Sequence, residues 1–248
     1  MNRTLVIIPT YDERENIEHI IRRTLDAAPV DVLVVDDGSP DGTADIVERM
    51  AHDDHRITLM RRSGKGGLGA AYIAGFACAR EREYALAVEM DADGSHPPER
   101  LPAMIAQFDN DPPLLGCVVG SRWVKGGSVV NWPAHRRFIS RAGSLYARVM
   151  LGVPVRDVTA GFRVYPTVVL AGLTLDTIES RGYCFQIDMT RRIDASGLRI
   201  VEVPIEFRER ELGHSKMSGE IVVEAIWRVT VWGFQRAALG LTRWMRRG

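Results

Sequence analysis

Short apolar runs recur along the first half of this 248-residue chain, and a segment of helical composition follows each of the first four. The runs cover residues 5–9, 32–35, 57–60, 85–90 and 114–122. Apolar runs without polar alternation are typical of strands that are buried on both faces, and the helices between them favour right-handed crossovers to parallel neighbours. We therefore expect an α/β fold whose mostly parallel sheet is flanked by helices.

The second half of the chain is less regular. Its composition predicts, in order, a loop over 126–133, a basic amphipathic helix over 135–152, a loop and short strand over 156–166, a helix over 183–197 and a strand over 198–210. We find no internal repeat and no linker. The sequence thus predicts one compact domain over residues 1–219, followed by a helical tail over 220–248.

Composition excludes several classes of protein. With 46% hydrophobic and 26% charged residues, the chain is an ordinary globular protein. Its 32 basic residues balance 32 acidic ones, so no global positive field exists and we expect no nucleic-acid partner. The three cysteines share no short spacing, which favours buried thiols over a disulfide framework or a zinc site.

Targeting signals are also missing from the sequence. The first residues become acidic before any long apolar stretch, unlike a signal peptide, and no run of about 18 apolar residues occurs. We expect a cytoplasmic protein.

Acidic side chains follow three of the predicted strands, namely Asp12 and Glu13, Asp36 and Asp37, and Asp91 and Asp93. In an open parallel sheet, the carboxyl ends of the strands border one ligand crevice. Carboxylates gathered there repel one another, and a hard divalent cation such as Mg²⁺ or Mn²⁺ relieves the repulsion. The alternative is that they form turns and helix caps, which is a strong alternative for residues 36–42 and a weaker one for Asp91 and Asp93.

A glycine-rich segment is a second candidate for a ligand-binding site. Residues 64–69 match the dinucleotide-binding pattern and lie between a predicted strand and a helix. They follow the third strand, however, whereas that pattern belongs to the first strand–helix turn. The other interpretation is that the glycines let the backbone approach a ligand, to which Lys65 offers a charge. An NAD-dependent oxidoreductase that uses this segment is therefore one enzyme class that the sequence leaves open.

Basic residues gather later in the chain. Arg122 ends the fifth strand, Arg136, Arg137 and Arg141 lie on the predicted helix over 135–152, and Arg208, Arg210 and Lys216 surround a polar loop. Arginine and lysine bind phosphate through charge-assisted hydrogen bonds, so these residues predict a second anion site, with a solvated basic face as the alternative. His96 and His214 are interpreted as incidental loop histidines.

The tail has helical periodicity. Six apolar residues fall close to one line of a helix: Trp227, Val231, Phe234, Ala238, Leu241 and Met245. Arginines project to the other side. Such a helix can lie in a membrane interface or dock on the core of its own protein, and periodicity does not separate the two.

Taken together, the segments 8–17, 34–46, 64–76, 90–99, 120–122, 157–165 and 210–217 resemble the dolichol-phosphate mannosyltransferase family, also called polyprenyl-phosphate mannose synthases. The likeness runs from about residue 4 to 219. It implies an inverting glycosyltransferase with a single GT-A-like domain. The implied reaction transfers mannose from GDP-mannose to a polyprenyl phosphate.

The resemblance also implies roles for individual residues. The nucleotide-sugar contacts are Pro9, Tyr11, Glu13, Val35, Asp37, Ala92 and Ser95, with Lys65 added from the glycine-rich segment. Asp91 and Asp93 hold the metal, Mg²⁺ or Mn²⁺. Arg122, Arg210 and Lys216 close over the donor diphosphate and the acceptor phosphate, and together with the two aspartates they form the expected catalytic set. Arg136 and Ser140 correspond to an acceptor-phosphate site shared with Arg122.

Some alternatives stay open. Nothing in the spacing distinguishes mannose from glucose, so a UDP-glucose-dependent polyprenyl-phosphate glucosyltransferase is the nearest rival. A nucleotide-sugar-binding subunit without catalysis is another. We expect the chain to sit on the cytoplasmic face of a membrane, as a peripheral protein or with a membrane-protein partner.

Overall fold

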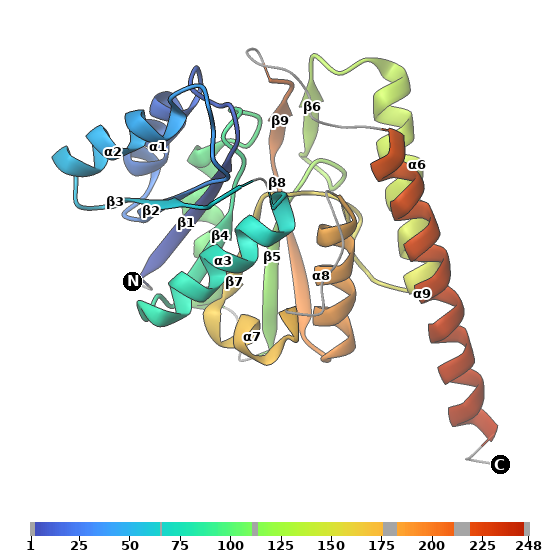
Figure 1. Cartoon of the computed structure of the whole chain (residues 1–248). Helices are drawn as coiled ribbons and strands as arrows, with labels where there is room; N and C mark the ends of the chain where they lie inside the picture. The colour runs from blue at the N-terminus through green and yellow to red at the C-terminus, as the bar shows by residue number, and fades with distance from the viewer. Residues whose placement is uncertain (1–2, 65, 111–113, 176–182, 211–218, 246–248) are drawn as a thin grey trace.

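The computed structural model describes residues 3–64, 66–110, 114–175, 183–210 and 219–245. Within these ranges a seven-stranded sheet is covered by helices on both faces, and a long C-terminal helix runs along one side (Figure 1). The predicted α/β class with a mostly parallel sheet is confirmed.

The sheet has the strand order β3-β2-β1-β4-β7-β5-β8. Its strands are β1 (Thr4–Thr10), β2 (Asp31–Asp36), β3 (Ile57–Arg61), β4 (Leu86–Glu89), β5 (Leu115–Ser121), β7 (Arg163–Pro166) and β8 (Arg199–Pro204). All five apolar runs of the first half are strands, as predicted. They lack polar alternation because successive residues enter two different cores, as Val6 and Ile7 of β1 do.

Strand β7 departs from the simple alternation. It comes from the second half of the chain and lies antiparallel between β4 and β5, pairing Val164 with Val88 on one side and with Val118 on the other. The sequence predicts a short strand here but not its place. A separate two-stranded ribbon joins β6 (Ser128–Val130) to β9 (Glu206–Arg208), so the prediction of a loop over 126–133 is wrong in part.

Two layers of helices cover the sheet. On one face lie α1 (Ile17–Ala27), α2 (Thr43–Asp53) and α4 (Leu101–Ile105), and on the other α3 (Leu68–Glu81), α7 (Thr167–Gly172) and α8 (Tyr183–Ala195). Two short helices, η1 (Pro98–Arg100) and α5 (Gln107–Asn110), flank α4. Helix α3 lies very close to β1, since a Cβ at Gly75 would stand 2.5 Å from Cγ2 of Ile7. Glycine is required there for the close approach.

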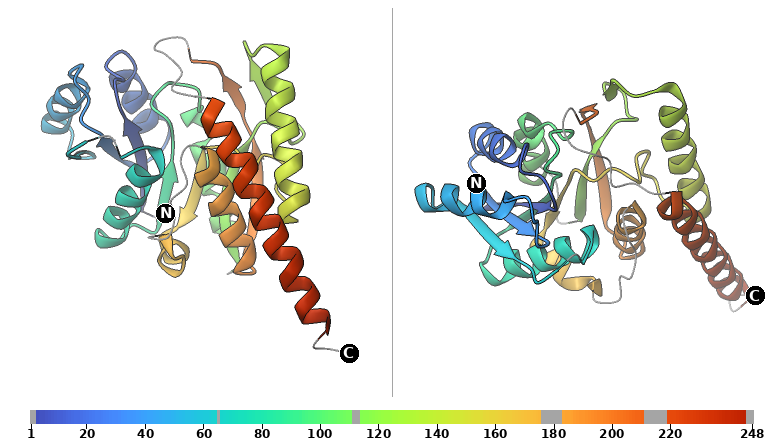
Figure 2. Two further views of the ribbon diagram at one scale, coloured as in Figure 1. Left: turned by 45° about the vertical axis from the view of Figure 1, so that its right-hand side comes forward. Right: turned by 45° about the horizontal axis from the view of Figure 1, so that its top comes forward.

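Helices α6 (Ala134–Leu151) and α9 (Gly219–Met245) pack against each other beside the sheet, as two further views show (Figure 2). A third core joins them through Ala147, Leu151 and Val229, with Trp232 packed against its edge. Helix α9 therefore docks on its own protein along the line of Val229 and Trp232. The apolar line expected from the sequence is a different one, and its Trp227 and Phe234 are each 68% exposed.

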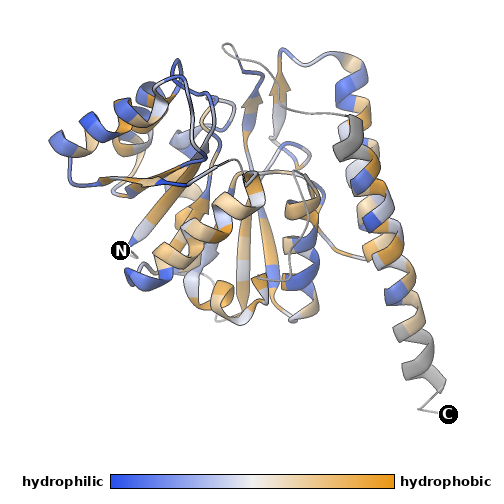
Figure 3. Ribbon diagram, viewed as in Figure 1, coloured by the Kyte–Doolittle hydropathy of each residue, from blue (hydrophilic) through white to orange (hydrophobic). Residues whose placement is uncertain are grey.

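Apolar side chains remain on the outer surface of both helices. Phe138 and Val149 of α6 are 73% and 70% exposed, and the hydropathy colouring shows apolar positions along α6 and α9 (Figure 3). None of the helices in the described part of the chain combines the length and the hydropathy that crossing a membrane requires. The side chains of Leu241 and Met245 lie outside the described residues, and the proposed boundary at residue 219 stays a prediction.

Candidate functional site

The three acidic segments meet at one edge of the sheet. Strands β2, β1 and β4 are neighbours and parallel, so the residues that follow them lie beside one another at their carboxyl ends, as the sequence predicts. Their side chains nevertheless have different partners.

Asp36 shapes its own turn. One of its carboxylate oxygens accepts the backbone N–H groups of Gly38 and Ser39 at 3.1 and 2.9 Å, and the other accepts the hydroxyl groups of Thr10 and Ser39 at 2.9 and 2.5 Å. The carboxylate is 2% exposed. The turn-forming alternative therefore holds for Asp36.

Asp37 closes the glycine-rich loop. Its carboxylate accepts the backbone N–H groups of Gly66 and Gly67, both at 3.0 Å, and pairs with Arg62 at 2.7 Å. In a dinucleotide site such amides would face a pyrophosphate. Here they face a carboxylate of the same protein, which disfavours the oxidoreductase alternative. Lys65 lies outside the described residues.

The other nucleotide contacts expected from the resemblance differ in accessibility. Pro9 and Val35 are partners across the β1–β2 pair, but Val35 is fully buried in the core and has only its backbone to offer. Glu13 is 8% exposed and accepts a hydrogen bond from Asn16 Nδ2 at 3.0 Å. Tyr11 is half-buried beside it in the same turn.

Residues 91–95 form the loop after β4. Ala92 is buried in the core, whereas Asp91 points outward, with 37% of its side chain exposed. Asp93 is 8% exposed and pairs with Arg210 at 2.8 Å. Its other oxygen accepts the backbone N–H of Ser95 at 3.1 Å. The buried Ser95 hydroxyl has no hydrogen-bond partner among the residues that the structure describes.

The surroundings of Asp91 favour a positive ligand. The protein packed around its carboxyl group raises the pKa of Asp91, His96 opposes the rise and Asp93 adds to it. The Tyr72 hydroxyl donates to one Asp91 oxygen at 3.3 Å. Within the described part of the chain, no cluster of three or more side chains that could hold a metal ion occurs.

His96 is a feature that the sequence prediction treated as incidental, and that interpretation is wrong. The ring is 2% exposed and stacks on Phe162 at a centroid distance of 5.3 Å. Its Nδ1 accepts the backbone N–H of Asp91 at 3.0 Å, and its Nε2 lies 3.8 Å from an Asp91 oxygen. His96 thus fixes the backbone of Asp91. No local spacing reveals this, because Phe162 is distant in the sequence.

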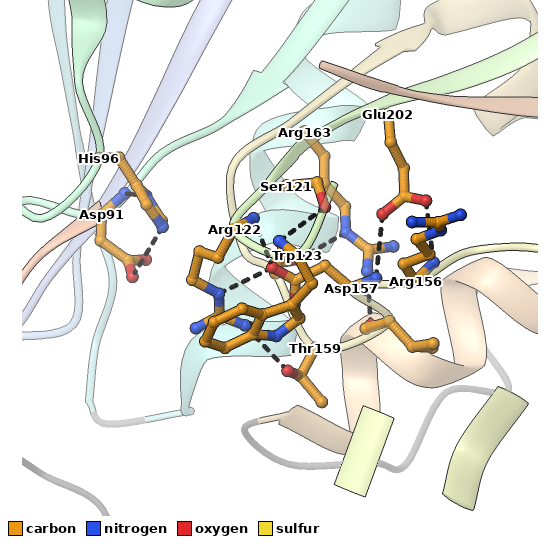
Figure 4. Close-up of polar contacts among 12 residues, drawn as sticks. Asp91, His96, Ser121, Arg122, Trp123, Arg156, Asp157, Thr159, Arg163 and Glu202 are labelled. Carbon is orange, nitrogen blue, oxygen red and sulfur yellow. Dashed lines mark hydrogen bonds and ion pairs between the residues drawn. The ribbon is translucent and has the colours of Figure 1, made fainter. Parts of the chain in front are cut away.

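Arg122 follows β5 and is held by Asp157. The Arg122 backbone N–H and Nε donate to one Asp157 oxygen, both at 2.8 Å, and Nη2 donates to the other at 2.6 Å (Figure 4). Nη2 also donates to Thr159 at 3.0 Å. Arg122 is 4% exposed and its partner Asp157 is fully buried. Neither Asp157 nor Thr159 is among the site residues that the sequence predicts.

Aromatic rings connect Arg122 to the rest of the site. The Phe207 ring lies 5.3 Å from its guanidinium carbon and 5.6 Å from the His96 ring. The Trp132 ring lies 5.4 Å from the guanidinium carbon of Arg122 and 4.5 Å from that of Arg136. The two arginines expected to bind acceptor phosphate are therefore on one indole.

The remaining residues predicted from the sequence lie partly inside and partly outside this site. Arg136 also pairs with Glu209, and Ser140 is half-buried one helical turn further along α6. Lys216 and His214 lie outside the described residues. The structure brings together Asp91, Asp93, Arg122, Arg136 and Arg210, while Asp36 and Val35 are absorbed by the fold.

Comparison with known proteins identifies close relatives. The chain is 53% identical over 246 residues to an undecaprenyl-phosphate mannosyltransferase of Micrococcus luteus, covering 96% of this chain and 100% of that protein. It is 50% identical to a polyprenol monophosphomannose synthase of Mycolicibacterium smegmatis, covering 94% of this chain and 88% of that protein. A dolichol-phosphate mannosyltransferase of Pyrococcus furiosus is 35% identical over 92% of this chain and 63% of its own length.

Solved structures share the fold. A mannosyltransferase of Pyrobaculum calidifontis, in complex with GDP-Man and Mn²⁺, superposes with a TM-score of 0.61 at 20% identity over 96% of this chain and 64% of that one. A glucosyl-3-phosphoglycerate synthase of Mycobacterium tuberculosis gives a TM-score of 0.67 at 18% identity over 92% of this chain and 80% of that one.

The family model described as glycosyl transferase family 2 matches residues 5–173, which include all but the first residue of the strands β1 to β7 as well as Asp91 and Asp93. This match covers more than half of the chain, and the curated relatives extend the likeness almost to both ends. The chain belongs to glycosyl transferase family 2.

Proposed function

We propose that this protein transfers mannose from GDP-mannose to the phosphate of a polyprenyl phosphate, with inversion at the anomeric carbon. The observation that carries the proposal is an acidic pair, Asp91 and Asp93, that the His96 and Phe207 rings connect to Arg122. Arg122 in turn shares one indole ring with Arg136. The names of relatives at 50–53% identity support the same reaction.

The acidic pair fits a hard divalent cation. Its two carboxylates supply oxygen ligands, and Mg²⁺ or Mn²⁺ commonly takes one or two protein carboxylates together with substrate phosphates. Asp91 is partly exposed, and burial has raised its pKa, so a cation would relieve the unfavourable charge. When bound, the metal would stabilise the negative charge of the leaving GDP.

The residues of this chain would do the remaining work by position and charge. A phosphate monoester is already anionic near neutral pH, so the acceptor needs little help from a general base. The difficulty is to bring this anion close to the donor diphosphate. Arg122 and Arg136 would hold the acceptor phosphate, and Arg210 would turn from Asp93 to the diphosphate.

The outer surface of α6 and α9 would place this site at a membrane. Phe138 and Val149 on α6 and Trp227 and Phe234 on α9 are all more than half exposed. Arg137 and Arg141 add exposed positive charge to α6. A basic surface with exposed aromatic side chains is suited to the interface of a membrane that contains anionic lipids. We propose a peripheral position on the cytoplasmic face, where a polyprenyl phosphate is within reach.

The main rival uses UDP-glucose, and the other is a binding subunit without catalysis. A transfer assay on the purified chain distinguishes them: radiolabelled GDP-mannose or UDP-glucose is offered with a ten-carbon prenyl phosphate, with Mg²⁺, with Mn²⁺ or with EDTA. We expect label in the organic phase only from GDP-mannose and only with metal. Label from UDP-glucose alone would favour the rival donor. Donor binding without any transfer would overturn the proposed reaction.

A further inference from the structure

The segment from Asp157 to Arg163 stood out in the sequence, yet the proposed function gives it no role. We propose that Asp157, assisted by Thr159, is the positioning residue for Arg122, which it holds in the one orientation that meets the acceptor phosphate. The inference rests on the proposed function, because it concerns how the acceptor is bound.

The contacts between Asp157 and Arg122 leave little freedom. A carboxylate that takes Nε and Nη2 together fixes the plane of the guanidinium group. The same carboxylate also accepts the Arg122 backbone N–H, so the side chain is held at its root as well as at its end. Thr159 then binds Nη2 from a second direction.

The backbone that carries the Asp157 carboxylate is also held by hydrogen bonds. Glu202 of β8 accepts the backbone N–H groups of Arg156 and Asp157 at 2.8 and 2.9 Å (Figure 4). The fully buried Arg163 donates to the backbone carbonyls of Val158 and Ala160, both at 2.7 Å. Because the backbone is fixed on both sides of Asp157, the Asp157 carboxylate keeps its position and holds Arg122 in one place.

The same segment also faces the acidic pair. Phe162 stacks on His96, which fixes the backbone of Asp91. A Cβ at Gly161 would stand 3.9 Å from an Asp91 oxygen, so the backbone passes directly beside that carboxylate. One rigid segment therefore sets the position of Arg122 relative to Asp91, and hence of the acceptor relative to the donor.

A purely structural ion pair would behave differently from a positioning one, and α8 offers the comparison. Asp188 is also buried, with its side chain 3% exposed, and it pairs with Arg191 at 2.5 Å and Arg192 at 3.0 Å. Its side-chain hydrogen bonds within the described ranges join it to Arg191 and Arg192 of the same helix. Loss of the Asp188 carboxylate therefore reports what a buried ion pair contributes to folding alone.

The first experiment keeps the ion pair and changes only Thr159. Thr159→Val removes the hydroxyl that accepts from Arg122, whereas Thr159→Ser retains it. We expect Thr159→Val to raise the KM for a ten-carbon prenyl phosphate at least about tenfold, as for the loss of one hydrogen bond to a charged group. The Kd of GDP with Mn²⁺ should stay within about twofold of the wild-type value, and Thr159→Ser should match wild type. Equal acceptor KM values for the two variants would overturn the role of Thr159.

The second experiment compares Asp157→Asn with Asp188→Asn. An asparagine places an N–H donor or a single acceptor where Arg122 now finds two acceptors, so the guanidinium group must turn. We expect the acceptor KM of Asp157→Asn to be at least about tenfold above that of Asp188→Asn, while the two variants show a similar decrease in Tm. If the two variants have the same acceptor KM, Asp157 is only structural. If Asp157→Asn does not fold, the Thr159 pair decides the matter.

Arg122→Lys separates this inference from the function on which it rests. A wild-type acceptor KM in Arg122→Lys would mean that Arg122 does not meet the acceptor phosphate, and the proposed role of Arg122 would fail. A raised KM in Arg122→Lys with unchanged KM values in the Asp157 and Thr159 variants would leave that role intact and overturn only the positioning by this segment.

Discussion

Asp91 and Asp93 are separated by one residue yet have different surroundings. Asp91 is partly exposed beside His96, whereas Asp93 is nearly buried and already faces a positive partner, Arg210. A cation bound by both aspartates would compete with Arg210 for Asp93. In the proposed function, metal binding by the acidic pair would therefore be coupled to the release of Arg210.

Asp93→Asn should lower the transfer rate by at least about 100-fold, because the substitution removes one of the two carboxylates that we propose as metal ligands beside the diphosphate. The rate is measured with saturating GDP-mannose and prenyl phosphate, and Mn²⁺ binding is followed separately by electron paramagnetic resonance. Asp26→Asn, at an exposed position of α1, is the control and should match wild type. Near-normal turnover of Asp93→Asn in Mn²⁺ would contradict the assignment.

Asp54, in the connection between α2 and β3, carries a pH-dependent contribution to stability. Hydrogen bonds from the Arg56 side chain and backbone lower the pKa of Asp54 to about 2. A carboxyl group whose pKa is lower in the folded state stabilises the fold above its unfolded pKa, and this stabilisation is lost as the pH falls through the folded pKa. Because the pair is near the surface, it is worth about 0.5–1 kcal/mol at pH 7.

Asp54→Asn should therefore lower the free energy of unfolding by about 0.5–1 kcal/mol at pH 7. The difference from wild type should shrink between pH 4 and pH 2, as wild type loses the charged form. Urea unfolding at a series of pH values measures it. A difference that does not depend on pH would assign the effect to the turn and not to the charge.

Single residues also mark where sequence reasoning stops. Asp91 and Asp93 were predictable because they directly follow a buried strand in an acidic context. His96 and Asp157 were not, since their partners Phe162 and Arg122 are brought to them only by the completed sheet. Residues that can bind a ligand are recognisable in the sequence, whereas residues that hold them in place through tertiary contacts are not.

Among the secondary-structure elements, β7 shows the same limit. The parallel strands were predictable from their near-continuous apolar runs. Strand β7 has only four residues and begins with Arg163, a fully buried charge whose partners are backbone carbonyls and Thr190. A charged residue inside a sheet gives no apolar signal, so the insertion between β4 and β5 could not be foreseen.

Arg163→Lys should destabilise the protein by about 2–4 kcal/mol. Arg163 donates from three nitrogens to four acceptors, and the single ammonium nitrogen of lysine cannot reach them all, which leaves buried carbonyls without a partner. Chemical denaturation measures the loss. Arg191→Lys on α8, at a partly exposed ion pair, is the matched control and should lose less than about 1 kcal/mol. Similar losses of unfolding free energy in the two variants would contradict the stabilising role of the Arg163 hydrogen bonds.

The molecule as a whole presents two different surfaces. Around most of the sheet the helices turn their apolar faces inward, whereas α6 and α9 also carry apolar side chains outward. Docking of α9 through Val229 and Trp232 leaves Trp227 and Phe234 on the outside. The arrangement gives the molecule one side that is suited to a lipid interface.

Replacing Trp227 and Phe234 together by serine should weaken binding to vesicles of mixed phosphatidylcholine and phosphatidylglycerol by more than about tenfold. Each large apolar side chain is worth about 1.5–3 kcal/mol when it leaves water. Co-sedimentation measures vesicle binding, and the affinity for GDP should not change. Val168→Ser is the control, because Val168 is 77% exposed on α7, away from α6 and α9. Unchanged vesicle binding in the double variant would exclude this surface.

The insertion of β7 also has a consequence for biosynthesis. A nascent chain that has reached residue 122 contains β4 and β5 but not the strand that lies between them. Until residue 166 leaves the ribosome, both strands have unpaired edges, and such edges invite pairing with other chains. The central sheet is thus completed late in translation, and a stalled ribosome within residues 122–166 would release a fragment prone to aggregation.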